Sequence, residues 1–523
     1  MPLLVVLLLA QMAVAMVTAA VRQTPTIDEP VYVGAAAEYT HEHRLRHNPE
    51  HPPLGKLVIG AGVALAAPHV DASFTGDQGR LGRHLLYESG NDPWRLMLWA
   101  RLPVIALTLL FGLVVFAFAR ELAGPAAGLA ALALYCFSPD VIAHGSLATL
   151  DVPAAGFALT SAWLVWRARR RPRLYVPLAG IALGAASATK MSMLPAVPVL
   201  MLLAGVSVRR GCGGGRRLVR AVAGAGAVAL AAIAVVWVAY LVVDPRLRWT
   251  PEQHVPVVRG MRGLLVQLLP FPEAYRDGMR VQFGLENRPW QGFLFGRLYD
   301  GSLWYYLPAA LLVKTPLGML ALWAGGVAAV VAVRRLRPAA PYVLAAPLVL
   351  LAAAMQGARD LGTRYAVFLP LFLAVAAGCL LVARRRWVPA GVAVLVALVG
   401  VSSVRTFPFY LPYSNEAFGG PDRAREWLHD SNVDWGQDLG RLAERLREGY
   451  AGERVWLVYK GSGVPGFYGI RAEDPRRVPA DAVRGLLVVS DSAAAKATGR
   501  LAELIGGSRP VEHVGHSITI YRS

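Results

Sequence analysis

The chain has 523 residues, of which 55% are hydrophobic and 17% are charged. Soluble enzymes of this size are less apolar, so the composition excludes that class and indicates a polytopic membrane protein. The formal net charge is +19, from 53 Lys and Arg against 34 Asp and Glu. Because the positive charges lie between apolar runs, they favour a role in membrane orientation, and no nucleic-acid partner is expected. The three cysteines lie in or beside apolar runs and indicate no disulfide framework.

Apolar runs recur along the first 404 residues. A helix needs roughly 20 residues to cross the hydrocarbon core, so the runs predict about 11 transmembrane helices. The run 1–21 could instead be a cleaved signal peptide, although no Lys or Arg precedes it, and the short run 57–67 is expected to lie along the interface. The expected spans are 1–21, 94–119, 125–143, 152–166, 174–188, 193–208, 218–243, 304–333, 339–355, 365–383 and 387–404.

Arginine-rich connections fall in alternate loops, and by the positive-inside rule these loops are cytoplasmic. They are residues 167–173, 209–220, 334–337 and 384–386. The same parity predicts a transmembrane domain over residues 1–405, with two large outer loops at 22–93 and 244–303. Residues 406–523 are expected to form a small extracytoplasmic α/β domain, because they contain two short strand-like runs, 455–460 and 485–491, and a helix-like run at 492–505.

Two adjacent acids, Asp28 and Glu29, follow the first apolar run. A carboxylate at the mouth of a membrane span can act as a general base where a hydroxyl meets a lipid-borne substrate. Asp28 could instead cap a helix that begins at Glu29-Pro30, since acids favour helix N-termini and Pro favours the first turn. The residues that accompany the pair have to distinguish these alternatives.

Further charged groups are predicted on the same outer face. Asp151 precedes an apolar run and could be a helix cap, Lys190 could extend to the interface, and Lys314 lies inside an apolar run, where a charge is costly unless it meets an anion. An Arg at the start of a span could bind a phosphate or flank the interface. The candidate substrate-binding residues are Glu50, His51, Lys56, Asp151, Lys190, Lys314, Arg364 and Tyr365.

Acids for a base and cations for a phosphate suit the transfer of a group carried on a lipid phosphate. If one carboxylate activates the acceptor while the phosphate leaves from the opposite side, a single displacement inverts the anomeric centre. Glu50 and His51 would also allow a divalent metal, but two ligands without a third indicate no definite cofactor.

The ordered motifs resemble those of the GT-C glycosyltransferases of the protein O-mannosyltransferase superfamily, which includes bacterial aminoarabinose transferases. They are DE at 28–29, HPPLGK at 51–56, SPDVIAHGSLATLD at 138–151, SATK at 187–190, YDGSLWYYLPAALLVKTP at 299–316 and GTRY at 362–365. The resemblance covers nearly the whole predicted transmembrane domain. It implies a GT-C fold, a polyprenyl-phosphate-linked sugar as donor, Asp28 as the catalytic base with Glu29 beside it, and Arg364 as the Arg of the RY signature.

The chain also departs from known subgroups. The loop 244–303 is too short for the β-trefoil of eukaryotic members, and the tail, with GGP at 419–421 and DSNVDWGQDL at 430–439, resembles bacterial lipid-carrier-dependent glycosyltransferases. The acceptor therefore stays open among protein, lipid and glycan. Asp434 and Trp435 could form an acceptor platform, or a helix cap and a packed ring. A membrane transporter or sensor scaffold is the alternative from another class, although no repeated halves are visible.

Overall fold

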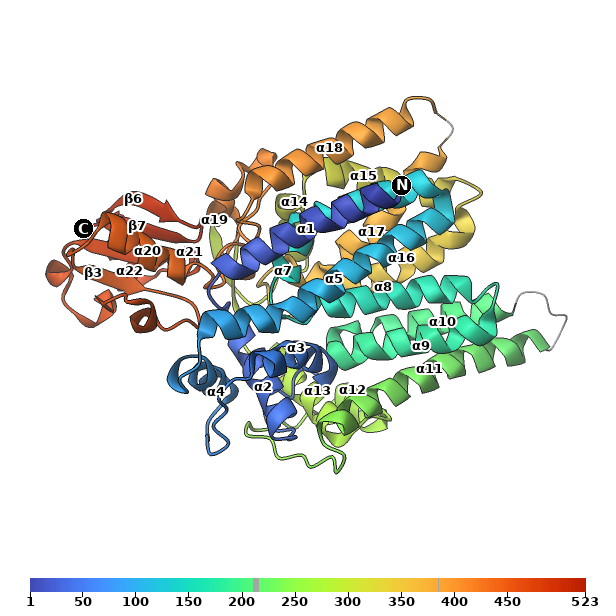
Figure 1. The fold of residues 1–523 in the computed structure, drawn as a ribbon, viewed down its shortest axis with the longest axis horizontal. Coiled ribbons are helices and arrows are strands. Elements are labelled where there is room, and N and C mark those ends of the chain that lie inside the picture. Colours follow the sequence, from blue (N-terminus) through green and yellow to red (C-terminus); the bar gives the residue numbers. More distant parts are fainter. Residues whose placement is uncertain (210–215, 384) are drawn as a thin grey trace.

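The computed structural model describes residues 1–209, 216–383 and 385–523, so parts of the arginine-rich connections 209–220 and 384–386, together with Cys212, lie outside the described residues. The chain forms a bundle of apolar helices that carries a small β-sheet at one end (Figure 1). This architecture confirms the predicted fold class, a helical membrane protein with a small C-terminal region of mixed α and β structure.

Five helical segments are long and apolar enough to cross a membrane, or six if one bent pair is a single span. The bent pair consists of α6 and α7, which meet at 61°. Because these numbers cover the described residues only, the predicted total of about 11 spans is not confirmed. The segments are α1 (Pro2–Arg22), α5 (Pro93–Ala123), α11 (Arg216–Val243), residues 337–354 including α16 (Ala340–Ala354), α18 (Val388–Thr406), and the pair α6 (Pro125–Cys136) and α7 (Pro139–Gly145).

The other predicted spans are also helical, but each is shorter or less apolar than the segments above, or is interrupted. They comprise α8 (Asp151–Arg167), α9 (Pro172–Thr189), α10 (Ala196–Val208) and α17 (Phe368–Cys379). The run 304–333, expected as one span, is two helices, α14 (Tyr306–Lys314) and α15 (Leu317–Ala332). Pro316 separates them, since proline lacks a backbone donor and forces the preceding residue out of the helical region.

The two large loops contain helices of their own. The first holds α2 (Glu29–His41), α3 (Pro53–Ala66) and α4 (Gln78–Arg83), and the second holds α12 (Gly260–Leu268), α13 (Glu273–Glu286) and the hairpin of β1 (Gln291–Leu294) with β2 (Arg297–Asp300). Helix α3 packs against α2 and α5. Both loops lie toward the end of the bundle that carries the C-terminal sheet (Figure 1).

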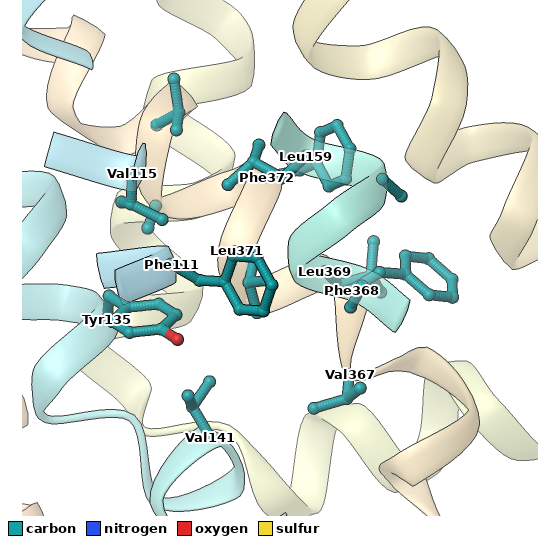
Figure 2. Close-up of a cluster of buried hydrophobic side chains, with 14 of the residues drawn as sticks. Phe111, Val115, Tyr135, Val141, Leu159, Val367, Phe368, Leu369, Leu371 and Phe372 are labelled. Carbon is teal, nitrogen blue, oxygen red and sulfur yellow. The ribbon is translucent and has the colours of Figure 1, made fainter. Parts of the chain in front are cut away.

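The bundle is held together by a large apolar core in which α5, α6, α8 and α17 meet (Figure 2). Phe111 of α5, Leu159 of α8 and Phe372 of α17 are almost completely buried. Gly156 allows α8 to approach α5 closely, because a Cβ atom at this position would lie 2.1 Å from the Phe111 ring. The Tyr135 hydroxyl is satisfied by the Thr108 carbonyl at 2.7 Å, so this polar group is buried without an unpaired donor.

The C-terminal sheet has five strands in the order β4-β3-β5-β7-β6. The pairs β3–β4 and β3–β5 are parallel, while β5–β7 and β6–β7 are antiparallel. The strand-like runs at 455–460 and 485–491 correspond to β3 and β5, and the helix-like run 492–505 is split into α21 and α22. The elements are α19 (Ala424–Trp427), α20 (Leu439–Gly449), β3 (Val455–Val458), β4 (Ala472–Glu473), β5 (Leu486–Ser490), α21 (Asp491–Ala495), α22 (Gly499–Gly506), β6 (Arg509–Val514) and β7 (Ile518–Arg522).

Candidate active site

The centre of the candidate site is an ion pair between Asp28 and Arg364, which are 336 positions apart in the sequence. The Arg364 Nη1 atom donates to Asp28 Oδ2 at 2.5 Å. Asp28 stands at the N-cap position of α2, but its side chain makes no capping hydrogen bond. The Asp28 side chain is 27% exposed, whereas the Arg364 side chain is 9% exposed. Asp28 therefore occupies the N-cap position of α2, but its side chain binds Arg364 and does not cap the helix.

Two aromatic rings restrict the Arg364 guanidinium. Its carbon lies 4.3 Å from the centre of the Trp435 ring and 5.0 Å from the centre of the Tyr365 ring, and Nη2 donates to the Tyr365 hydroxyl at 3.2 Å. Among the residues that the structure describes, the buried Arg364 Nε atom has no hydrogen-bond partner. A guanidinium held by ring faces keeps its charge and its planar donors directed at an anion.

A second ion pair, between Lys190 and Asp151, lies beside the same ring. Lys190 follows α9, Asp151 begins α8, and the two side chains are hydrogen-bonded and almost completely buried. The Lys190 Nζ atom lies 5.4 Å from the centre of the Tyr365 ring. Asp151 is the first residue of its helix and makes no N-cap, so its partner is the lysine. The structure thus brings two acids and two cations together around Tyr365.

Glu29 has a different environment from its neighbour. Its carboxylate is buried and accepts two hydrogen bonds from Arg101 at 2.7 Å, together with bonds from the Thr26 amide, the Thr26 hydroxyl and the Ala148 amide. Burial would raise the pKa of Glu29, but the charge and hydrogen bonds of Arg101 lower it below the usual value. Because its acceptor positions are filled, Glu29 is suited to hold the loop in place, and direct contact with a substrate would require these bonds to break.

Arg101 was missed by the sequence reasoning, although a signal was present. It is a charged residue inside the apolar run 94–119, and such residues are functional candidates by default. Besides Glu29, its guanidinium binds the carbonyls of Ala20, Gln23 and Thr24. Arg101 therefore fixes the chain that leads from α1 to Asp28.

Glu50, His51 and Lys56 form a network next to this centre. Glu50 accepts from the amides of Gln78 and Gln253, and Lys56 donates to the carbonyls of Asn48 and His51, each at 2.7 Å. Burial lowers the pKa of Lys56 to about 7. The His51 ring is 5.6 Å from the Tyr32 ring, and its Nδ1 atom has no hydrogen-bond partner in the part of the chain that the structure describes. Burial and the charges of Lys190 and Lys56 hold the pKa of His51 well below its usual value, which keeps the ring neutral.

Lys314 and Asp434 bind other parts of the protein. The Lys314 Nζ atom donates to the carbonyls of Leu411 and Asn432 at 2.6 and 2.7 Å, so the cation expected at a phosphate is bound to main chain. Asp434 accepts from the amides of Ser492 and Gly436 and is fully buried. Trp435 does reach the centre, but it is 1% exposed and offers no open face for a sugar.

Metal binding was left open for Glu50 and His51. Within residues 1–209, 216–383 and 385–523, no group of three or more His, Cys, Asp or Glu side chains is arranged to hold a metal ion. The Glu50 oxygens are bound by glutamine amides. The centre therefore consists of Asp28, Asp151, Lys190, Arg364, Tyr365 and Trp435, with His51 at its edge.

Two sizeable cavities lie away from this centre. One, of about 600 Å³, is an apolar recess between Phe137 and α18, and the other, of about 540 Å³, lies between the C-terminal end of α1, the N-terminal end of α5 and the start of α20. Neither cavity is lined by a candidate residue. Within the candidate centre, the Asp28 side chain is 27% exposed, and Tyr365 and His51 are partly exposed.

Comparison with protein families gives a match to the dolichyl-phosphate-mannose-protein mannosyltransferases over residues 5–245. The match includes Asp28, Asp151 and Lys190 and ends before Arg364. It confirms the resemblance inferred from the motifs and favours an enzyme over the transporter or scaffold. A search of curated proteins found no match.

Among solved structures, ArnT from Cupriavidus metallidurans in the apo state aligns over 99% of this chain and 97% of its own, with 16% identity and a TM-score of 0.49. The same protein bound to undecaprenyl phosphate aligns with 17% identity and a TM-score of 0.47, over 99% of this chain and 97% of its own. The Pmt1-Pmt2 complex of S. cerevisiae bound to the sugar donor covers 47% of this chain and 33% of its own, at 18% identity and a TM-score of 0.36.

Proposed function

From the glycosyltransferase match, we propose that this protein transfers a sugar from a polyprenyl-phosphate donor to a hydroxyl group on a protein, lipid or glycan. The reaction takes place at the outer face of the cytoplasmic membrane, the side assigned to the candidate residues by the arginine-rich loops. The observation that carries the proposal is the Asp28–Arg364 ion pair, which joins a partly exposed carboxylate to a buried guanidinium. Asp28, the proposed base, and Arg364, the proposed anion-binding group, are thus joined directly by a hydrogen bond.

The pair provides a mechanism for a single displacement. When the donor phosphate binds Arg364, it replaces the carboxylate as the partner of the guanidinium, and Asp28 becomes free to accept a hydrogen bond from the acceptor hydroxyl. The hydroxyl oxygen then bonds to the anomeric carbon while the bond from that carbon to the phosphate oxygen breaks. The hydroxyl proton passes to Asp28, and the polyprenyl phosphate leaves with its charge balanced by Arg364 and Lys190. Attack opposite the leaving group inverts the anomeric centre.

The test is sugar transfer by the purified full-length protein in lipid vesicles. Radiolabelled sugars on polyprenyl phosphate serve as donors, and membrane protein, lipid and glycan fractions serve as acceptors. We expect Asp28→Asn to lower kcat by about 100-fold or more, because general base catalysis contributes roughly that factor. Asp300→Asn is the matched control, since Asp300 is an exposed acid at the end of β2.

The fraction in which the radiolabel appears, protein, lipid or glycan, identifies the acceptor class. Transfer by the wild type and by Asp300→Asn, together with its loss in a folded Asp28→Asn variant, supports the proposal. Full activity of Asp28→Asn would refute the base assignment, and an absence of transfer from every donor would refute the proposed reaction.

A further inference from the structure

Residues 430–438, with the sequence DSNVDWGQD, lie between the two loops that supply Asp28 and Arg364. On the first side, the segment binds the residues that lead to Asp28. The Ile27 amide donates to the Trp435 carbonyl and the Thr24 amide to the Gln437 carbonyl, each at 3.0 Å. The Thr24 hydroxyl adds a bond to the Gly436 carbonyl at 3.1 Å. The segment therefore fixes the backbone immediately before the proposed base.

On the second side, Asn432 binds the backbone immediately before Arg364. Its Oδ1 atom accepts from the Thr363 amide at 3.0 Å, and its Nδ2 atom donates to the Tyr306 hydroxyl at 2.9 Å. Lys314 donates to the Asn432 carbonyl, and this hydrogen bond stabilises the buried cation. One amide side chain thus connects the Arg364 loop to α14 and to the C-terminal segment.

Trp435 completes the connection by covering the guanidinium itself. Its ring centre is 4.3 Å from the Arg364 Cζ atom, and its amide donates to the Gln437 side chain at 2.8 Å, which closes a tight turn. Because the ring is 1% exposed, its contacts are with the protein. The Trp435 ring therefore sets the direction in which Arg364 presents its charge.

The segment is also bonded to the C-terminal α/β region, through Ser492 of α21 and Lys460 in the loop after β3. Asp434 accepts from the Ser492 amide at 2.9 Å, and the Ser492 hydroxyl donates to the Asp434 carbonyl at 2.8 Å. Lys460, which follows β3, pairs with Asp430. Helix α21 and the loop after β3 consequently hold the segment from the C-terminal region.

We propose that residues 430–438 are a positioning element of the reaction centre, in which Asn432 and Trp435 hold Arg364 and Asp28 in their mutual geometry. This inference rests on the proposed function. It gives the C-terminal domain a direct part in the transfer step, in addition to any contact with the acceptor. The physical reason is that Asp28 and Arg364 come from distant parts of the chain, so other contacts have to keep them in place once the donor phosphate replaces their ion pair. A displacement of about 1 Å can cost roughly 100-fold in rate.

The experiment compares four variants of the full-length protein: Trp435→Leu, Trp435→Phe, Asn432→Ala and, as a matched control, Trp456→Leu. Trp456 is a fully buried tryptophan of β3 that binds the Arg484 carbonyl. We expect Trp435→Leu and Asn432→Ala to lower kcat by about 100-fold with less than about threefold change in KM for the donor. Trp435→Phe keeps a ring over Arg364 and is expected to retain most of the activity, and Trp456→Leu is expected to lower the melting temperature without lowering kcat of the folded protein.

Hydrogen–deuterium exchange supplies a readout that does not depend on activity. Peptides covering residues 24–32 and 360–367 are expected to exchange faster in Trp435→Leu and Asn432→Ala than in the wild type, and to be unchanged in Trp456→Leu. Unchanged exchange in both peptides, an equal loss of kcat in the control, or an effect on KM alone would overturn the positioning role. If the wild type transfers no sugar, the proposed function fails, and the exchange result still decides whether the segment holds the two loops.

Discussion

Arg101 and Glu29 form a buried bidentate ion pair, with two N–O distances of 2.7 Å. Both side chains are at most 1% exposed, so neither charge has water to stabilise it. A buried charge that loses its partner is strongly destabilising, because its desolvation is no longer compensated. Because Glu29 is adjacent to Asp28, the Arg101–Glu29 pair holds the backbone at Asp28 in place without contacting the Asp28 side chain.

We expect Arg101→Gln and Glu29→Gln each to lower the free energy of unfolding by about 3–5 kcal/mol. Thermal melting of the purified protein in detergent measures the effect. Glu121→Gln is the control, since Glu121 pairs with the more exposed Arg167 and Arg170 and should shift the melting temperature little. Equal shifts for Glu29→Gln and Glu121→Gln would contradict the assignment of the buried pair as a main structural contact.

Lys314 is expected to affect stability more than donor binding. Its two hydrogen bonds satisfy buried carbonyls of Leu411 and Asn432, and each carbonyl left unpaired costs roughly 1–3 kcal/mol. Lys314→Met should therefore lower the melting temperature, while the folded fraction keeps the wild-type KM for the polyprenyl-phosphate donor. A tenfold rise in KM at unchanged stability would return Lys314 to the role of phosphate ligand.

Local sequence patterns were sufficient for the helices and for several charged candidates. Apolar runs predicted the positions of the helices, and Asp28, Lys190 and Arg364 were recognisable as charges at the ends of such runs. Pro316 marks the break between α14 and α15, although the apolar residues on both sides of it predict a single span. Strand β6 was missed because RPVEHV at 509–514 combines proline with charged residues and lacks a regular apolar alternation, whereas β7, ITIYR at 518–522, was missed although β-branched residues favour a strand there.

The partners of the charged residues could not be predicted, because they depend on contacts between distant segments. Nothing near Lys314 in the sequence indicates that its partners are carbonyls of residues 411 and 432. Similarly, Asp28 and Glu29 are adjacent and chemically alike, yet one faces Arg364 and the other faces Arg101. The sequence indicates these groups as candidates, and the tertiary structure separates a partly exposed acid from a buried one.

Asp434 should make stability depend on pH in the range just below neutrality. Burial raises its pKa from 3.8 to about 7. The folded protein therefore holds this proton more tightly than the unfolded chain, so the stabilisation is complete below a pH of about 3.9 and is lost as the pH rises through about 7. We expect the melting temperature of the wild type to fall more steeply between pH 5 and 7 than that of Asp434→Asn. Parallel curves for the two proteins would show that Asp434 does not titrate in this range.

Lys190 and Asp151 allow a test that separates substrate binding from structural pairing. Lys190→Met leaves Asp151 buried without its cation, so we expect both a lower melting temperature and a loss of transfer. The double variant Lys190→Met/Asp151→Asn removes both charges and should recover much of the stability. If Lys190 neutralises the donor phosphate, the recovered protein will still show at least about a tenfold lower kcat/KM, because a charge-assisted contact to the leaving group is missing. Recovery of both stability and transfer in the double variant would show instead that the pair only supports the fold.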